Sequence, residues 1–314
     1  MTKPVLKTVT RTQGNNRALK EGEVTATDFD FEFEEVNPLV KAFRLMVREG
    51  AYDVSEMALT TYICAKAHGA RLTALPVFLV RDFHHKSMAR SLASDIRHPK
   101  DIEGRRIGVN RGYTVTTGVW ARSILADDYD VDLQSVTWLR SGDEHVAEYR
   151  PPANVEDLGS ERGLEEQLGQ GDLPAVIGLS ANGKTTAPLV DDPDDAALRA
   201  FRDRGLYPIN HVVVVRDDIL ADMPDVAVQV FDAFARSKRR YVEALKAGRI
   251  SEPTRIDKVH MAVMEAMDDP LPYGIAPNIE MLELLMRHAV EQKIIDRPFE
   301  IVDLFAPAVR EAVG

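Results

Sequence analysis

Two continuous apolar runs constrain most strongly what this chain can fold into. Residues 72–80 read Leu-Thr-Ala-Leu-Pro-Val-Phe-Leu-Val, and residues 209–215 read Ile-Asn-His-Val-Val-Val-Val. Runs of this length and composition are typical of strands that are covered on both faces. Because helical patterns alternate with such strands along the chain, we expect an α/β layer fold with a mostly parallel sheet.

The alternation continues on both sides of these runs, and after residue 215 the pattern becomes helical. Further strands are predicted at residues 5–10, 29–33, 53–57, 85–92, 106–109, 136–140 and 173–179. Helices are predicted at 16–21, 39–48, 60–68, 99–104, 161–168, 226–248 and 281–290, and the acidic run 191–195 is typical of a helix start. Gly22 and Gly50 follow two of these helices as stop signals.

Residues 108–122 form a strand, a turn at Gly112 and then a helix rich in threonine at its start. The backbone N–H groups and positive dipole end of such a helix suit a carboxylate or phosphate. The hydroxyl groups of this anion site would come from Thr114, Thr116 and Thr117, and the neighbouring Tyr113 either lines a substrate cleft or packs in the core. The alternative is an ordinary strand-to-helix connection with polar caps. In either case we expect burial of Trp120 and Ile124 to position the helix.

Length and composition exclude several classes of protein. A chain of 314 residues exceeds a typical single core, so two domains are expected. The net charge is −11 and no Lys/Arg run exceeds three residues, which argues against nucleic-acid binding. Cys64 is the only cysteine, so no intrachain disulfide forms. No segment has the length of a membrane span and residues 1–16 lack a leader pattern, so we expect a cytoplasmic protein.

Metal sites and nucleophilic triads are poorly supported. His84 and His85 are adjacent, and adjacent residues in a strand point to opposite faces. The chain has no His-x-x-Glu-His motif, no cysteine cluster and no Gly-x-Ser-x-Gly motif. We therefore predict neither a metal nor another cofactor.

Several stretches resemble the 4,5-dihydroxyphthalate decarboxylases, a family related in fold to type 2 periplasmic solute-binding proteins. The most specific are Glu-Met-Ala-Leu at 56–59, Ile-Asn-His at 209–211 and Pro-Tyr-Gly at 272–274. The resemblance implies two lobes with a ligand cleft between them and a helical C-terminal part. The implied lobes are 1–88 with 212–314, and 89–211. Residues 171–184 and 84–87 depart from the family pattern, which leaves open a different acid as the substrate on the same scaffold.

The resemblance also implies a chemistry and a set of site residues. A hydroxylated aromatic dicarboxylate loses CO2 most easily when its ring carbon is first protonated, so the site needs an acid and donors for carboxylates. The implied catalytic residues are His85, His211 and Glu56, with His85 the favoured acid, His211 orienting a phenol, and Glu56 holding a proton or orienting a histidine. The implied substrate-binding residues are Arg17, Arg81 and Thr60, together with the threonine-rich helix start.

Each of these residues also has a structural interpretation that the sequence leaves open. The histidines could be satisfied core residues, the arginines surface residues, and Glu56 a partner of the helix that begins near Thr60. The predicted function is cofactor-independent decarboxylation of a small aromatic carboxylate such as 4,5-dihydroxyphthalate. The alternatives are a solute-binding protein without catalysis and an enzyme of this scaffold acting on another aromatic acid. No nucleic-acid or membrane partner is expected, and a homo-oligomer is left open.

Overall fold

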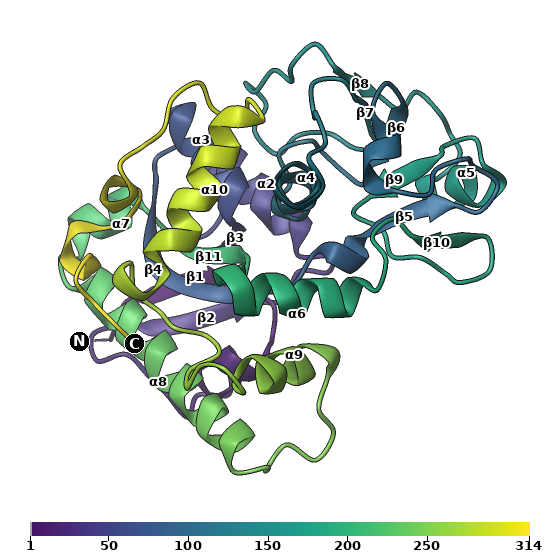
Figure 1. The fold of residues 1–314 in the computed structure, drawn as a ribbon. Coiled ribbons are helices and arrows are strands. Elements are labelled where there is room, and N and C mark those ends of the chain that lie inside the picture. The colour runs from purple at the N-terminus through teal and green to yellow at the C-terminus, as the bar shows by residue number, and fades with distance from the viewer. Residues whose placement is uncertain (1) are drawn as a thin grey trace. The chain divides into compact units, whose positions relative to one another are not determined.

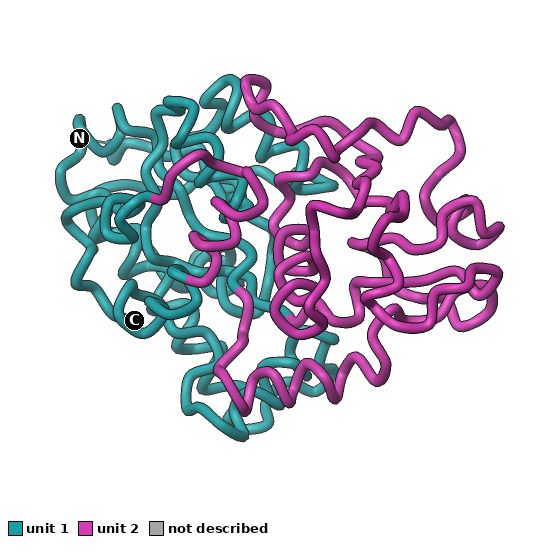
Figure 2. Tube along the Cα trace, turned by 45° about the horizontal axis from the view of Figure 1, so that its top comes forward, with its two compact units in different colours: residues 1–82, 209–283, 299–314 teal, residues 83–208, 284–298 magenta. Residues whose placement is uncertain are grey.

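The computed structural model describes residues 2–314, and Figure 1 shows its ribbon. The chain forms two compact units, coloured separately in Figure 2. Unit 1 comprises the chain up to Asp82 together with Ile209–Glu283 and Phe299–Gly314. Unit 2 comprises Phe83–Pro208 and Leu284–Pro298.

Unit 1 contains a five-stranded sheet in which the two apolar runs of the sequence pair with each other. The strand order is β2 (Asp30–Glu34), β1 (Val5–Val9), β3 (Val54–Ala58), β11 (Ile209–Arg216) and β4 (Leu72–Arg81). β1 runs parallel to β2 and β3, whereas β11 runs antiparallel to β3 and β4. Every residue of β3 is buried, as the apolar pattern of a strand covered on both faces requires.

Two amphipathic helices of unit 1 each bury one apolar stripe. α2 (Val40–Glu49) buries Phe43 and Met46 and ends at Gly50, whose φ of 60° suits glycine. α8 (Val226–Lys246) buries Val230 and Phe234 at helical spacing. The other helical segments are η1 (Gly14–Asn16), α1 (Arg17–Lys20), α3 (Leu59–Ala67), α7 (Asp217–Asp222), α9 (Arg255–Val263), η4 (Ala276–Asn278), η5 (Ile301–Leu304) and η6 (Pro307–Val309). α10 (Ile279–Glu291) begins in unit 1 and continues in unit 2.

Unit 2 contains a six-stranded mixed sheet. Its order is β10 (Thr186–Pro188), β5 (Met88–Ser91), β9 (Ala175–Ile177), β6 (Arg106–Val109), β7 (Thr137–Arg140) and β8 (Val155–Asp157). Its helical segments are η2 (His85–Ser87), η3 (Pro99–Ile102), α4 (Thr116–Tyr129), α5 (Leu164–Gln170) and α6 (Pro193–Arg204). Trp120 and Ile124 of α4 are almost completely buried, which confirms the expectation that they position this helix.

The α/β class, the main strands and the helical C-terminal part are confirmed, and three details differ from the sequence-based expectation. The sheets are mixed, because β11 in unit 1 and β5 and β10 in unit 2 run against their neighbours. His85 lies in the 3-10 turn η2, so the predicted strand 85–92 begins only at Met88. β8 and β10 were not predicted, because three-residue strands are too short to show a period.

The boundaries of the two units also differ in detail from the predicted lobes. The chain divides after Asp82 and Pro208 rather than after residues 88 and 211, and residues 284–298 join unit 2. Side-chain contacts with α4 explain why residues 284–298 belong to unit 2. The Nε of Arg122 on α4 donates to Gln292 Oε1 at 2.8 Å, and His288 Nε2 lies 2.9 Å from Asp127 Oδ2.

A buried histidine in unit 1 makes the stability of the protein depend on pH. The Tyr241 hydroxyl hydrogen-bonds to Asp257 and lies 2.7 Å from His260 Nδ1. Because the hydroxyl donates to the carboxylate, it accepts from a protonated Nδ1. His260 Nε2 is buried without a hydrogen-bond partner among residues 2–314. Burial lowers the pKa of His260 to about 4, although the nearby Asp257 carboxylate acts in the opposite direction.

We therefore expect stability to fall as the pH is lowered from about 6.5 to about 4. In that window the unfolded chain protonates this histidine, while the folded chain holds it neutral, with a pKa of about 4. The loss is on the order of 3 kcal/mol. Urea unfolding at a series of pH values should show a smaller slope for His260→Asn across this window, with parallel curves above pH 7. Equal slopes for parent and variant would contradict the assignment.

Candidate functional site

One end of the sheet in unit 1 gathers polar residues from strands that are distant in sequence. β1, β3 and β4 end there and β11 begins there, because His211 pairs with Ala58 of β3 and with Val80 of β4. β1 reaches the same end, with Val9 opposite Ser55. The end of an open α/β sheet beyond the carboxyl termini of its strands is a common position for ligands.

A Glu–His pair occupies this end of the sheet. Glu56 is completely buried, and its Oε1 lies 2.6 Å from His211 Nδ1. Its Oε2 accepts the backbone N–H of Arg11 at 2.9 Å. Each carboxylate oxygen therefore has a donor, as a buried carboxylate requires. The His211 side chain remains 19% exposed, and the edge of its ring meets the ring of Phe43 at 5.2 Å between centroids.

This geometry fixes the orientation and tautomer of the histidine. An ionised carboxylate only accepts hydrogen bonds, so His211 Nδ1 carries the proton that points to Glu56. His211 Nε2 has no hydrogen-bond partner in the part of the chain that the structure describes. A histidine oriented in this way by a carboxylate is suited to accept or donate a proton at its other nitrogen.

The predicted residues near this end of the sheet occupy different environments. Thr60 is buried in the first turn of α3, which begins directly after β3. Arg17 lies on α1 with 61% of its side chain exposed, 3.7 Å from Glu21. Arg81 is buried and its Nη1 donates to Asn278 Oδ1 at 2.8 Å. The amide of Asn278 in turn donates to the carbonyls of Pro272 and Gly274, so Arg81 supports the Pro-Tyr-Gly turn.

His85 belongs to unit 2, and neither of its ring nitrogens has a hydrogen-bond partner among residues 2–314. It is 1% exposed, and its Nε2 lies 3.5 Å from Asp128 Oδ2. The same carboxylate pairs with Arg204 of α6. The ring therefore lies where η2 meets α4 and α6, and its proposed catalytic role stays a prediction.

The threonine-rich stretch binds an anion that the chain itself provides. The Glu144 carboxylate accepts the N–H groups of Tyr113 and Thr114 at 2.6 and 3.1 Å, and the Thr114 hydroxyl at 2.7 Å. Gly112 allows this approach, because a Cβ there would lie 2.6 Å from Glu144 Oε2. The sequence does not indicate this contact, because no spacing rule relates Glu144 to Tyr113 and Thr114.

The other predicted residues of this stretch are largely buried in unit 2. Tyr113 is 1% exposed, and the guanidinium of Arg122 lies 3.8 Å from the centre of its ring. Burial raises the pKa of the Tyr113 phenol, so it stays neutral at pH 7. Thr116 is buried in the first turn of α4, whereas Thr117 is half-buried.

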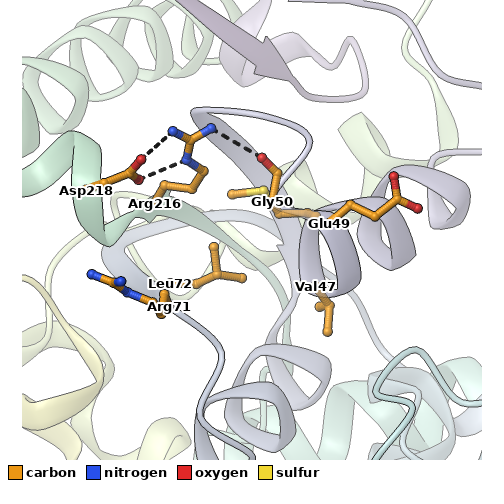
Figure 3. A pocket seen from close by; sticks show the side chains of 8 residues that line it. Val47, Glu49, Gly50, Arg71, Leu72, Arg216 and Asp218 are labelled. Atoms are coloured by element: carbon orange, nitrogen blue, oxygen red, sulfur yellow. Dashed lines mark hydrogen bonds and ion pairs between the residues drawn. The ribbon is translucent and has the colours of Figure 1, made fainter.

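A pocket in unit 1 lies at the opposite end of the same strands (Figure 3). Leu72 begins β4 there and Arg216 ends β11. Figure 3 shows Arg216 pointing toward Asp218 and toward the Gly50 carbonyl, so its charge is already paired. We therefore place the candidate chemistry at Glu56 and His211 instead. The lining residues are Met46, Val47, Glu49, Gly50, Arg71, Leu72, Arg216 and Asp218.

Residues 2–314 contain neither a metal-binding cluster nor a membrane-spanning helix. Residues 2–314 contain no cluster of three or more His, Cys, Asp or Glu side chains arranged to bind a metal ion. Over the same residues, no helix has the length and hydropathy needed to span a membrane.

Solved structures similar to this chain share its fold at low sequence identity. The alkanesulfonate-binding protein SsuA from Xanthomonas axonopodis pv. citri has a TM-score of 0.54 at 13% identity, covering 98% of this chain and 99% of its own. The desulfurization enzyme DszB has a TM-score of 0.58 at 15% identity, covering 97% of each chain. The fold is therefore that of the periplasmic-binding-protein-like proteins.

Sequence comparison identifies closer relatives, although no family model matches the chain. A 4,5-dihydroxyphthalate decarboxylase from Comamonas testosteroni is 27% identical over 319 residues, which cover 94% of each chain. A 4,5-dihydroxyphthalate decarboxylase from Pseudomonas putida is 33% identical over 200 residues, which cover 59% of this chain and 77% of the relative. The chain belongs to the 4,5-dihydroxyphthalate decarboxylase family.

Proposed function

We propose that this protein decarboxylates a hydroxylated aromatic dicarboxylate such as 4,5-dihydroxyphthalate, giving protocatechuate and CO2. Family membership supports the reaction type. The observation that supports a site for it is the Glu56–His211 pair, a carboxylate-oriented histidine at the end of a sheet. The histidine is partly exposed, so it can contact a substrate and exchange protons with water.

The reaction needs one proton and no net oxidation. In 4,5-dihydroxyphthalate each carboxylate-bearing carbon has a hydroxyl group para to it. Protonation of that ring carbon forms a C–H bond and a cationic ring, which the para hydroxyl stabilises by electron release. The C–C bond to the carboxylate then breaks, its electron pair restores the aromatic ring, and CO2 leaves. The ring itself accepts and returns the electrons, so no electron-accepting cofactor is required.

We assign the acid to His211 and a positioning role to Glu56. His211 Nε2 would donate the proton to the ring carbon, and solvent would restore it afterwards. Glu56 would hold the ring and stabilise its protonated form through Nδ1. The sequence favours His85 as the acid, but His85 is 1% exposed and has no hydrogen-bond partner at either ring nitrogen among residues 2–314, whereas His211 is 19% exposed and oriented by Glu56.

The alternative function is capture of a small carboxylate without catalysis. The fold does not decide between the two, because it is shared by a sulfonate-binding protein and a desulfurization enzyme. A binding protein needs donors for its ligand but no positioned acid. The Glu56–His211 pair therefore favours the enzyme.

Substitution of the pair tests the mechanism. We expect His211→Asn to bind 4,5-dihydroxyphthalate within about tenfold of the parent while losing about 10²- to 10⁴-fold in kcat, because a positioned acid typically contributes that much. Glu56→Gln should lower kcat less, because the amide can still hold the His211 ring in place.

His85→Asn is the matched control and should keep a kcat within a few fold of the parent. Release of CO2 and formation of protocatechuate are measured together for all variants. A parental turnover for His211→Asn would remove it as the acid. If the parent binds hydroxylated aromatic acids and releases CO2 from none, the binding-protein alternative is correct.

Chelation tests the proposal that no metal takes part. We expect dialysis against EDTA to leave kcat unchanged, because the proposed mechanism uses a histidine acid and the electrons of the ring. Activity that is lost with EDTA and restored by a divalent cation would contradict the cofactor-free mechanism.

A further inference from the structure

We infer that Arg11 binds the ring carboxylate that the substrate retains. This inference rests on the proposed function, and it adds a substrate-binding residue that the sequence pattern did not indicate. Arg11 lies two residues beyond the end of β1, and its backbone N–H donates to Glu56 Oε2 at 2.9 Å. The other oxygen of the same carboxylate contacts His211, so a single side chain links Arg11 to the proposed acid.

The backbone of Arg11 is fixed on both sides. Its N–H is held by Glu56, and its carbonyl accepts the Asn16 amide at 2.8 Å. Asn16 is itself buried and also accepts the N–H of Gln13 at 2.8 Å. The base of the arginine is therefore preorganised, which reduces the entropy cost of placing its guanidinium on a ligand.

The guanidinium of Arg11 is exposed and has no carboxylate partner among residues 2–314. Its one side-chain contact is with the neutral amide oxygen of Gln13 at 3.5 Å, the outer limit of a hydrogen bond. Arg17, by contrast, pairs with Glu21, and Arg81 is buried against Asn278. Of these three arginines, Arg11 combines an exposed guanidinium that has no carboxylate partner among residues 2–314 with a backbone bond to Glu56, the partner of His211.

Decarboxylation chemistry decides which carboxylate a cation here should hold. The departing carboxylate becomes neutral CO2, so an ion pair with it would stabilise the ground state and raise the barrier. An ion pair with the neighbouring carboxylate is kept from substrate to product. A guanidinium matches that carboxylate through two parallel N–H donors. The substrate class is therefore an aromatic ring with a second carboxylate beside the one that is lost.

Ligand binding by isothermal titration calorimetry tests this role without relying on turnover. The probes are protocatechuate, which keeps one carboxylate, and catechol, which has none. We expect Arg11→Gln to weaken protocatechuate binding about 10- to 100-fold and to leave catechol binding unchanged. KM for 4,5-dihydroxyphthalate should rise by a similar factor while kcat changes by about threefold or less. Arg11→Lys should restore part of the affinity.

Arg199→Gln is the matched control, because it removes an exposed arginine of unit 2 that pairs with Asp195, and it should bind both probes as the parent does. Unchanged protocatechuate affinity in Arg11→Gln overturns the inference, as does equal weakening of catechol or a parent that does not bind protocatechuate. If protocatechuate binding depends on Arg11 but the parent releases no CO2, the proposed decarboxylation fails and the carboxylate site stands.

Discussion

The buried carboxylate of Glu56 is the constraint on which the proposed site depends. A charged group without exposure is costly unless hydrogen bonds replace its water. Glu56 obtains them from two other strands: the backbone beyond β1 donates to one oxygen, and His211 at the start of β11 donates to the other. The same two bonds fix the backbone of Arg11 and the tautomer of His211, so the requirement to satisfy a buried charge also orients a histidine.

Unit 2 contains a second buried carboxylate that is satisfied differently. Glu144 receives two backbone N–H groups and one hydroxyl from the segment before α4, with Arg140 at 3.5 Å. These donors satisfy the carboxylate but leave no titratable ring exposed beside it. Glu144 therefore shapes a loop, whereas Glu56 orients a histidine. We assign the proposed chemistry to unit 1 for this reason.

The fold and the function are decided at different levels. The same architecture is found in a sulfonate-binding protein and in an enzyme at identities of 13% and 15%, so it shows only how the strands and helices are arranged. The family assignment rests on relatives of higher identity. The assignment of acid, positioning residue and carboxylate-binding residue is a proposal that rests on the contact between the Glu56 and His211 side chains and on the bond from the Arg11 backbone to Glu56.

The sequence by itself determined the local structure, because apolar runs, helical spacing and stop signals such as Gly50 act over a few residues. It also indicated Glu56 and His211 as separate candidates, each at the end of a predicted strand. Only the tertiary structure paired them, because they are 155 residues apart and meet through the antiparallel register of β3 and β11. The same long-range packing buries Arg81 against Asn278 and brings the backbone of Arg11 to Glu56. It also brings Glu144 to the donors of Thr114, so these donors bind a carboxylate of the chain itself. Contacts between distant segments leave no periodic signal in a single sequence, so these assignments required the folded chain.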